Sequence, residues 1–507
     1  MMMQQGMNED KRRLYAQVDQ LWQALETFAQ DGTAVHVVER HLFRELLKLG
    51  FELLGYFFRL LGSGDQGAQV TLPGGRVLKR LDGMRERRYQ SVFGEFVLAR
   101  WVYGVQEKQA YEYVPLDARL QLPASLFSYL VQDWAQALAV EFSFEHVSDV
   151  LNRILGLKLG VSALERMNRG MAGAVVGYAA EVKAKPAPES QFIVVSADGK
   201  GVPMRKAADQ PPIRAHDGRR GPPVDRKKMA ILGAVYDAMA HVRTPEQVVD
   251  ALFGQSVAAN NDAPVPRPKP IAKVVKASLT HTAPEGTVVN AREVIFPWLG
   301  DEVRQRDPDG SKPIIVLMDG QHCLWTDAQK ALAGRSRVEI LDLLHATSKL
   351  WDVAHAFYAD PAERLTAMKG YTLWLLRGKA AGLAILFRYW ADTASLEPAA
   401  RQKVEGVCAY FEQHQDRMRY HEYLAAGYPI ASGVIEGACR HVVKDRLERT
   451  GMHWTLEGAQ AMLKLRCVAI NEQWDEFTAF RIQRETQRLY PHTTLYEVEE
   501  WPMKRAA

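Results

Sequence analysis

The stretch FIVVSADG at residues 192–199 decides the class of fold, because it is a short apolar strand that runs into an aspartate. The same pattern returns in PIIVLMDG at residues 313–320. MAILGAVY at residues 229–236 and VEILDLL at residues 338–344 read as further strands, and the last one leads to His345. Short apolar runs with many β-branched residues are typical of buried strands. Together with the helical segments around them, these strands predict an α/β fold.

Three acidic residues lie at the ends of predicted elements and could share one site. Asp198 ends or interrupts the first strand, Asp319 ends a later strand, and Glu436 falls in the first turn of a predicted helix. Side chains converge at strand ends in an open sheet. Carboxylate oxygens suit Mg²⁺, and two such ions about 3.5–4 Å apart stabilise both oxygens of a phosphoryl displacement. We therefore predict Asp198, Asp319 and Glu436 as catalytic residues and as ligands of two Mg²⁺ ions, with Mn²⁺ as an alternative.

Each of these acids also has a plainer interpretation. Asp-Gly is a frequent turn dipeptide, so Asp198–Gly199 and Asp319–Gly320 could be ordinary turns. Glu436 could merely favour the positive end of its helix, which is worth roughly 0.3–1 kcal/mol. Taken singly, each acid fits its plainer interpretation better. The order of strand with Asp, strand with Asp, long helical segment and helix with Glu favours a shared site.

Other chemistries have weaker signals in the sequence. His322 and Cys323 lie close to Asp319, but no second pair of ligands follows at the spacing of a zinc site. The chain contains neither G-x-S-x-G nor a Walker A sequence. In the D-x-x-H pattern of Asp342 and His345, the histidine could orient a ligand or a phosphate, or make a structural hydrogen bond at a strand end.

The composition excludes several classes of protein. Of the 507 residues, 47% are hydrophobic and 24% are charged, and the formal net charge is only +4. These values argue against a disordered chain, a collagen-like repeat or a uniformly basic coat for nucleic acid. The four cysteines form no C-x-x-C pair, and no stretch approaches the roughly 20 apolar residues of a membrane helix. We expect a cytoplasmic protein without a membrane partner, associated with the nucleoid when it binds DNA.

Residues 142–171 (FSFEHVSDVLNRILGLKLGVSALERMNRGM) have the outline of a helix-turn-helix. Ser143 can cap a first helix, and a glycine turn is followed by a capping box that begins a second helix at Ser162. The second helix would present Arg166 and Arg169, which suit phosphates and base edges. An ordinary helical hairpin explains the pattern equally well.

Two loops and one helix add basic residues. Residues 200–228 carry nine Lys or Arg against three Asp, and residues 260–276 are basic and rich in proline. One such loop is more simply solvated surface, but two loops beside one set of strands favour contact with the DNA backbone. Arg440 and Lys444 follow Glu436 at four-residue steps, so they could hold phosphate or form a solvated basic face. The predicted DNA-contacting residues are Arg166, Arg169, Lys200, Arg219, Arg220, Lys227, Lys228, Arg440, Lys444 and Arg446.

Changes of periodicity divide the chain into segments. Residues 11–62 read as helix, residues 88–105 as a hairpin, and residues 183–190 as a linker. Residues 350–426 read as a helical stretch that contains several tryptophans, which are more simply core residues than platforms for an extruded base. The predicted domains are an N-terminal helical region (1–85), a hairpin with the helix-turn-helix (86–190), the first part of a core (191–346), a helical insertion (347–430) and the last part of the core (431–507).

Several blocks of the chain together resemble bacterial insertion-sequence transposases of the DDE type, most closely the ISKra family. The final block is the most specific, whereas the Asp-Gly dipeptides alone are weak, and the resemblance covers about residues 85–480. The blocks are VSADGKGVP at 195–203, KMAILGAVY at 228–236, IIVLMDGQHCLW at 314–325, VEILDLLHATSKLWDVA at 338–354 and SGVIEGACRHVVKDRLERTGMHW at 432–454.

The resemblance implies an RNase H-like core with a long helical insertion, preceded by a mainly helical DNA-binding region. It implies that Asp198, Asp319 and Glu436 are the metal-binding triad of a transposase. Water would attack the phosphodiester at the transposon end, and the freed 3′ hydroxyl would then attack target DNA. The implied partners are double-stranded DNA and further copies of the chain, as a homodimer or larger assembly on DNA. Two alternatives stay open: an RNase H-like nuclease that cleaves without joining, and a non-catalytic DNA-binding descendant, against which the intact triad argues.

Overall fold

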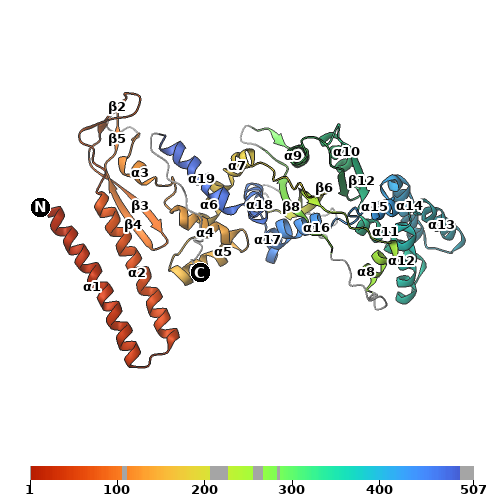
Figure 1. Ribbon diagram of the computed structural model, residues 1–507, viewed down its shortest axis with the longest axis horizontal. Coiled ribbons are helices and arrows are strands. Elements are labelled where there is room, and N and C mark those ends of the chain that lie inside the picture. The colour runs from red at the N-terminus through yellow and green to blue at the C-terminus, as the bar shows by residue number, and fades with distance from the viewer. Residues whose placement is uncertain (1, 106–110, 206–226, 255–266, 283–285, 492–507) are drawn as a thin grey trace, which may run out of the picture. The chain divides into compact units, whose positions relative to one another are not determined.

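The structure is a computed structural model of the chain, and it describes residues 2–105, 111–205, 227–254, 267–282 and 286–491 (Figure 1). The chain divides into two compact units, which are residues 1–178 with 473–507, and residues 179–472. Within the described ranges, no helix combines the length and the apolar character that crossing a membrane requires.

The first unit combines helices with short sheets. Its elements are α1 (Met2–Gln30), α2 (Val35–Leu61), β1 (Gln69–Thr71), β2 (Val77–Arg80), β3 (Arg85–Ser91), β4 (Gly94–Arg100), β5 (Tyr103–Gly104), α3 (Pro115–Leu120), α4 (Tyr129–Ala139), α5 (Phe144–Leu155), α6 (Val161–Ala172), α7 (Val175–Glu181) and α19 (Trp474–Leu489).

The N-terminal helical prediction over residues 11–62 is confirmed with one break. The chain reverses between α1 and α2, where Gly32 adopts a φ of 61° that other residues rarely tolerate. The predicted hairpin is also confirmed, as β3 and β4 pair in antiparallel register. The hairpin packs on α2, because the ring of Phe96 stacks on Phe51 with 4.5 Å between the centroids.

Residues 142–171 do form two successive helices, α5 and α6. Both the helix-turn-helix and the ordinary helical hairpin predict such a pair. Ser143 caps α5 by accepting a hydrogen bond from the backbone N–H of His146 at 3.2 Å, and Gly156 ends the helix with a φ of 70°. The predicted capping box at Ser162 is wrong. The helix α6 begins one residue earlier, with Gly160 as an N-cap that offers no side chain.

The second unit is a mixed α/β structure. Its elements are β6 (Phe192–Pro203), β7 (Lys227–Ala238), α8 (Pro245–Phe253), β8 (Ile271–Leu279), β9 (His281–Thr282), β10 (Val288–Val289), α9 (Ala291–Arg306), β11 (Ile314–Met318), α10 (His322–Ala331), β12 (Arg337–Leu341), α11 (Leu343–Phe357), α12 (Pro361–Leu376), α13 (Ala380–Thr393), α14 (Pro398–His414), α15 (Tyr420–Ala425), α16 (Gly433–Ala438), η2 (Cys439–Lys444, a π-helix), α17 (Asp445–Leu447) and α18 (Leu456–Ile470).

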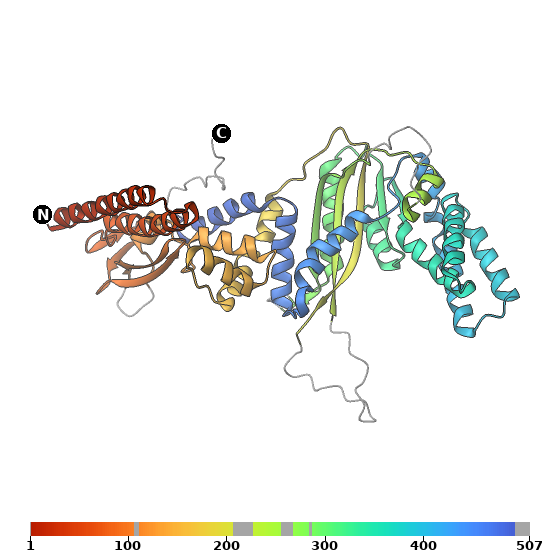
Figure 2. The ribbon, with the colours of Figure 1, turned by 90° about the horizontal axis from the view of Figure 1, so that it is seen from below.

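A five-stranded sheet organises the described part of this unit, with the strand order β12-β11-β6-β7-β8. The strand β11 pairs in parallel with both β12 and β6, whereas β7 pairs antiparallel with both β6 and β8. Figure 2 shows the strands side by side, with helices packed next to them. Every residue of β11 is buried, as expected for a strand covered on both faces. The α/β class predicted from the sequence is therefore confirmed.

Several element boundaries differ from the sequence-based expectation. The first strand does not end at Asp198 but continues to Pro203, because β7 pairs with it along its whole length. Residues 338–344 are not one strand, since β12 ends at Leu341 and Asp342 caps the helix that follows. Residues 271–276, expected as part of an exposed basic segment, belong to β8.

Near the C-terminus, apolar residues recur at three- and four-residue steps from Leu463 to Phe477, a spacing that predicts one amphipathic helix. The structure has two helices there, because α18 ends at Ile470 and α19 begins at Trp474. Glu472 between them has a φ of 58°. The helix α19 belongs to the first unit, whereas the sequence placed all of residues 431–507 in the core.

The long helical stretch between β12 and α16 is confirmed as α11 to α15. Trp351 and Trp390 are partly buried against the large core of the unit, as the core interpretation predicts. Trp374 differs from them, because 47% of its surface is exposed.

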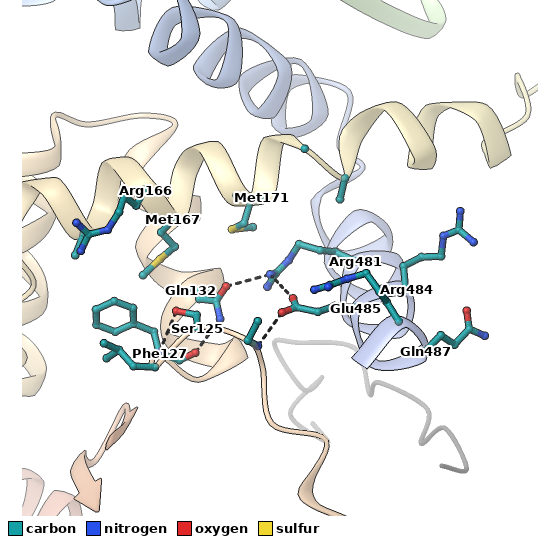
Figure 3. Close-up of a pocket in the computed structure, with 17 residues that line it drawn as sticks. Ser125, Phe127, Gln132, Arg166, Met167, Met171, Arg481, Arg484, Glu485 and Gln487 are labelled. Carbon is teal, nitrogen blue, oxygen red and sulfur yellow. Dashed lines mark hydrogen bonds and ion pairs between the residues drawn. The ribbon is translucent and has the colours of Figure 1, made fainter. Parts of the chain in front are cut away.

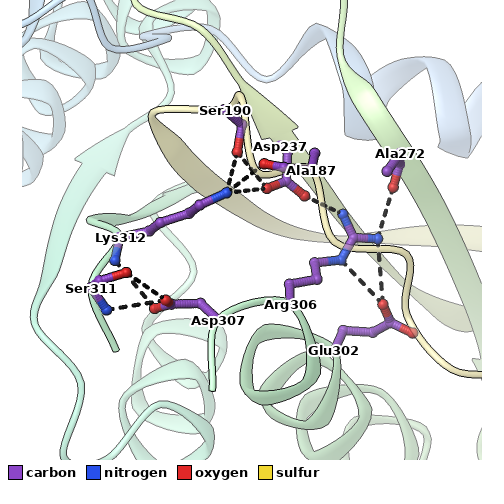
Figure 4. A network of polar contacts seen from close by, with 9 residues as sticks. All are labelled: Ala187, Ser190, Asp237, Ala272, Glu302, Arg306, Asp307, Ser311 and Lys312. Carbon is purple, nitrogen blue, oxygen red and sulfur yellow. Dashed lines mark hydrogen bonds and ion pairs between the residues drawn. The ribbon is translucent and has the colours of Figure 1, made fainter. Parts of the chain in front are cut away.

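A buried ion network joins the C-terminal end of β7 to α9 (Figure 4). The carboxylate of Asp237 on β7 is fully buried and accepts hydrogen bonds from Arg306 at 2.7 Å and from Ser190 at 2.7 Å. The ammonium group of Lys312 lies 3.5 Å from the same carboxylate and 2.6 Å from the Ser190 hydroxyl. The predicted linker therefore ends in an anchored residue. Removing one partner from such a network leaves a buried charge uncompensated.

We expect Asp237→Ala to lower the free energy of unfolding by about 3 kcal/mol, because it removes the buried carboxylate that pairs with both Lys312 and Arg306 and leaves the guanidinium of Arg306, 1% exposed, with Glu302 as its ion partner. Urea denaturation followed by circular dichroism measures this loss. The matched control is Asp392→Ala, which removes the exposed partner of Arg401 and should cost about 1 kcal/mol or less. Equal losses in the two variants would contradict a structural role for the network.

Candidate active site

Asp198 lies inside the central strand of the sheet. It sits opposite Leu232 of β7, so Asp198–Gly199 is not the ordinary turn that the dipeptide allows. One carboxylate oxygen accepts a hydrogen bond from the backbone N–H of Gly199 at 2.6 Å, and the other accepts one from the Cys439 thiol at 3.4 Å. The strand therefore carries a partly buried carboxylate at a defined place on the sheet.

Asp319 is the first residue after β11, and β11 is the strand that lies next to β6 with its Asp198. The last paired residues of these parallel strands are Val316 and Val195, and each aspartate lies three residues further along its own segment. The two aspartates therefore occupy equivalent positions along neighbouring strands. Asp319 accepts a hydrogen bond from the backbone N–H of Gln321 at 2.9 Å, so a turn does form here, as the plainer interpretation allows.

A buried tryptophan fixes the backbone of this turn. The indole N–H of Trp325 donates to the carbonyl oxygen of Asp319 at 2.7 Å, and the ring of Trp325 is only 2% exposed. The guanidinium of Arg417 lies 4.4 Å from the centre of the same ring. Gly320 leaves no room for a side chain, since a Cβ would lie 2.4 Å from the ring of Tyr410.

Glu436 lies on the short helix α16, which contacts β6 and β7. Its backbone N–H donates to the carbonyl oxygen of Ser432 at 3.0 Å, and its side chain remains accessible to solvent. A π-helix, η2, follows directly. Single π-helical turns inside α-helices are rare and frequently occur at functional sites. The four-residue steps assumed for Arg440 and Lys444 do not apply in this segment, because a π-helix bonds residue i to residue i+5.

The charge of Asp198 acts on both Asp319 and Glu436. Burial raises the pKa of Asp319, and the negative charges of Asp198 and Asp342 raise it further. Partial burial also raises the pKa of Glu436, again with Asp342 and Asp198 as contributing charges. The structure thus places Asp319 and Glu436 within reach of the same two negative charges.

Asp342 is a fourth carboxylate in this group, and the sequence did not single it out for chemistry. It is fully buried, caps α11 through Leu344, and accepts hydrogen bonds from the backbone N–H and the hydroxyl of Ser432. Because Ser432 immediately precedes α16, these bonds hold the start of the helix that carries Glu436. Its sequence signal is weak, because Asp342 falls inside the predicted strand at residues 338–344, three residues before His345.

His345 faces the same group of acids. Its Nδ1 atom lies 3.8 Å from the carboxylate of Asp342, and among the described residues this buried nitrogen has no hydrogen-bond partner. A positive charge on His345 would lower the pKa of both Asp319 and Glu436. The histidine therefore offers a donor, or a neutral nitrogen ligand, beside the carboxylates.

The chemistry of these side chains fits a divalent cation. Carboxylate oxygens are the ligands that Mg²⁺ and Mn²⁺ accept, and a cation would offset the burial and the like charges that raise the pKa values of Asp319 and Glu436. The side chains do not yet surround a common point. Among the described residues, no group of three or more His, Cys, Asp or Glu side chains is arranged to hold a metal ion. The fit is therefore one of side-chain chemistry, and in this structure the three carboxylates do not form a metal-ion site.

The basic residues predicted near the carboxylates have different surroundings. Lys200 lies close enough to Cys439 for its charge to affect the thiol, next to Asp198. Lys444 is exposed, and the side chain of Arg440 is 71% exposed at 3.7 Å from Asp445. Arg446 is fully buried, with its guanidinium 5.0 Å from the centre of the Trp454 ring, so in this structure it is not available to a phosphate.

The remaining predicted DNA contacts are spread over both units. Lys227 and Lys228 are exposed at the start of β7, where Lys227 pairs with Glu448 at 2.8 Å. Arg219 and Arg220 lie outside the described residues. In the first unit Arg166 is exposed and Arg169 half-buried on α6. DNA contact by these residues stays a prediction.

Comparison with known proteins adds no assignment. No protein-family model matches this chain, and no curated protein is similar to it in sequence.

We expect Asp319→Asn to raise the free energy of unfolding at pH 7 in buffer with a chelator, because it removes a buried, repelled charge. The carboxyl has a raised pKa in the folded state, so its destabilising effect is fully present above that raised pKa. The effect disappears below the ordinary value of 3.8, where the group is protonated in both states. Urea denaturation at pH 7 and at pH values below 3.8 measures the difference.

The control for this prediction is Asp352→Asn, which neutralises an exposed aspartate on α11 and should leave stability unchanged at both pH values. Adding Mn²⁺ should stabilise the wild type and the control variant but not Asp319→Asn. An Asp319→Asn variant that is less stable than the wild type at pH 7 would show that its charge is favourably compensated within the protein, contrary to the account above.

Proposed function

We propose that the protein is a DDE-type DNA transposase, in which Asp198, Asp319 and Glu436 act together in cleaving transposon ends and joining them to target DNA. The observation that carries this proposal is that the charge of Asp198 acts on both Asp319 and Glu436. Two of them hold equivalent positions on neighbouring parallel strands, and the third approaches from a helix more than a hundred residues further along the chain. Acids that serve only to stabilise the fold would not need to gather at a place where burial and like charge make their ionisation unfavourable.

The architecture of the second unit supports an RNase H-like core. Three antiparallel strands, β6 to β8, are followed by two parallel strands, β11 and β12, on the other side of β6. The helices α11 to α15 then intervene before α16. This order agrees with a catalytic core interrupted by a helical insertion, which the resemblance to DDE transposases implies.

The proposed chemistry is direct displacement at phosphorus. Asp198 and Asp319 would hold divalent cations at the sheet, and Glu436 would complete the ligand set from α16. When bound, two such ions activate the attacking oxygen and neutralise charge on the leaving oxygen. The chain's own contribution is to hold the acids, through Trp325 and through the Asp342–Ser432 contact, at fixed places on the sheet. The attacking groups are water and then a DNA 3′ hydroxyl, so the proposal requires no protein nucleophile.

The basic residues around the carboxylates would bind the DNA backbone. Lys200, Arg440 and Lys444 are the predicted contacts that lie on or beside the elements carrying the acids. Phosphate contacts of this kind hold DNA in register and are weakened by salt. We further propose that two transposon ends are held by a homodimer or larger assembly formed on DNA, because joining requires both ends in one complex.

We expect Asp319→Asn to lower transposition by about 10²-fold or more, because it removes a charge that the transition state needs. The measurement is a cell-based assay with a donor plasmid that carries the coding sequence with its own flanking DNA, read by sequencing donor and target junctions. The control is again Asp352→Asn, which should retain wild-type activity.

The DNA products of the same assay also distinguish a transposase from an RNase H-like nuclease. Joined junctions in target DNA support a transposase, whereas cut donor DNA without junctions supports an RNase H-like nuclease that cleaves without joining. Undiminished cutting by the Asp319→Asn variant would contradict the assignment of the site itself.

A further inference from the structure

The first unit contains a cavity of about 920 Å³ that the proposed chemistry does not use (Figure 3). It lies between α6, α19 and the segment of residues 124–127. Its volume falls in the range of pockets that take small-molecule ligands, about 300–1,000 Å³. All of its lining residues belong to the first unit.

The lining is strongly basic. Four arginines and a single acid, Glu485, contribute to it, and the arginines come from two different helices. Glu485 is already engaged, since it accepts a hydrogen bond from the backbone N–H of Ala124 at 2.9 Å and lies 3.5 Å from Arg481. The charge of the cavity therefore favours an anion. The arginines are Arg166 on α6 and Arg481, Arg484 and Arg488 on α19.

Arg481 is the unusual member of this set, because only 5% of its surface is exposed. Figure 3 shows it reaching from α19 toward Gln132, whose side-chain oxygen accepts a hydrogen bond from Nη1 at 3.0 Å. Its guanidinium also lies 5.3 Å from the centre of the Tyr129 ring. Within the described part of the chain, Nε and Nη2 have no hydrogen-bond partner. Buried donors without acceptors are costly, and a ligand rich in acceptor oxygens would satisfy them.

The rest of the lining is apolar and partly open. Phe127, Met167 and Met171 line the cavity, and Figure 3 shows the two methionines in the space between Arg166 and Arg481. Gly170 of α6 also lines it, and a Cβ placed on that glycine would meet nothing within 4 Å. An aromatic and two thioethers beside a group of arginines suit a flat ring that carries an anionic group.

We propose that this cavity binds a phosphorylated nucleoside, with the phosphate among the arginines and the base against the apolar wall. Guanidinium groups bind phosphate oxygens through paired, charge-assisted hydrogen bonds. The same chemistry is present at the 5′-phosphate end of a DNA strand and in a free nucleotide. The inference goes beyond the proposed function and does not depend on it, because it involves none of the carboxylates.

The test measures binding by the full chain in buffer with a chelator. The probes are a short fluorescent single strand with a 5′-phosphate, the same strand with a 5′-hydroxyl, adenosine monophosphate and inorganic phosphate. We expect the 5′-phosphate to tighten binding about tenfold or more, which corresponds to one or two charged hydrogen bonds. Contact between α6 and the DNA backbone alone would not depend on the terminal phosphate.

The decisive variant is Gly170→Leu, which should place an apolar side chain in the part of the cavity next to α6 without unfolding the helix. Leucine is a better helix former than glycine, and the space around the Cβ position is open. We expect this variant to lose the preference for the 5′-phosphate while its thermal stability is unchanged or raised. The matched control is Gly382→Leu, an exposed helical glycine of α13 with equally open surroundings, which should bind like the wild type.

A second pair of variants tests the charges. The double variant Arg166→Gln with Arg488→Gln should also lose the tenfold preference, whereas Arg119→Gln, at an exposed arginine outside the cavity, should keep it. Competition by adenosine monophosphate identifies a free nucleotide as sufficient, and a preference without such competition identifies a strand end; both support the proposal. Equal affinity for the two strands together with no monophosphate binding would overturn it. So would wild-type binding by Gly170→Leu, or inorganic phosphate competing as well as the monophosphate.

Discussion

Like charges held close together on neighbouring strands are the constraint on which the rest of this structure depends. Asp198 and Asp319 take equivalent places along neighbouring strands, and Glu436 approaches from α16, so burial and the charge of Asp198 raise the pKa of both Asp319 and Glu436. The fold must therefore supply compensating stability elsewhere. It does so through a sheet whose central strands are buried and through paired buried ions such as Asp237 and Arg306.

Two hydrogen-bonded contacts explain how Asp319 and the helix that carries Glu436 are held in place. Trp325 holds the Asp319 backbone, and the buried carboxylate of Asp342 binds Ser432 at the entrance to the Glu436 helix. The second contact joins residues 90 positions apart in sequence, so the helices α11 to α15 can be inserted without displacing the site. The π-helix after α16 changes the helical step just past Glu436 and sets which basic side chains accompany it. Support from buried neighbours of this kind is what a preorganised site requires.

Much of the fold and of the candidate site was predictable from the sequence, because the patterns that indicate them lie within short segments. Apolar runs that end in aspartate predicted β6 and β11, and the capping serine Ser143 predicted the start of α5. The role of Asp342 was not predictable, since a buried carboxylate that binds a residue 90 positions away leaves no local pattern. The burial of Arg446 was not predictable either. Its charge suggests an exposed side chain, but in the folded protein the guanidinium packs against Trp454. The sequence also could not reveal that α19 joins the first unit and forms a cavity with α6 there.

The most direct test of the central claim is a crystal structure of the protein soaked with Mn²⁺, with the ion located by its anomalous scattering. The account predicts at least one strong peak within coordination distance of the carboxylates of Asp198 and Asp319, with Glu436 turned toward it. Peaks only at other places, with these three side chains directed apart, would contradict the account.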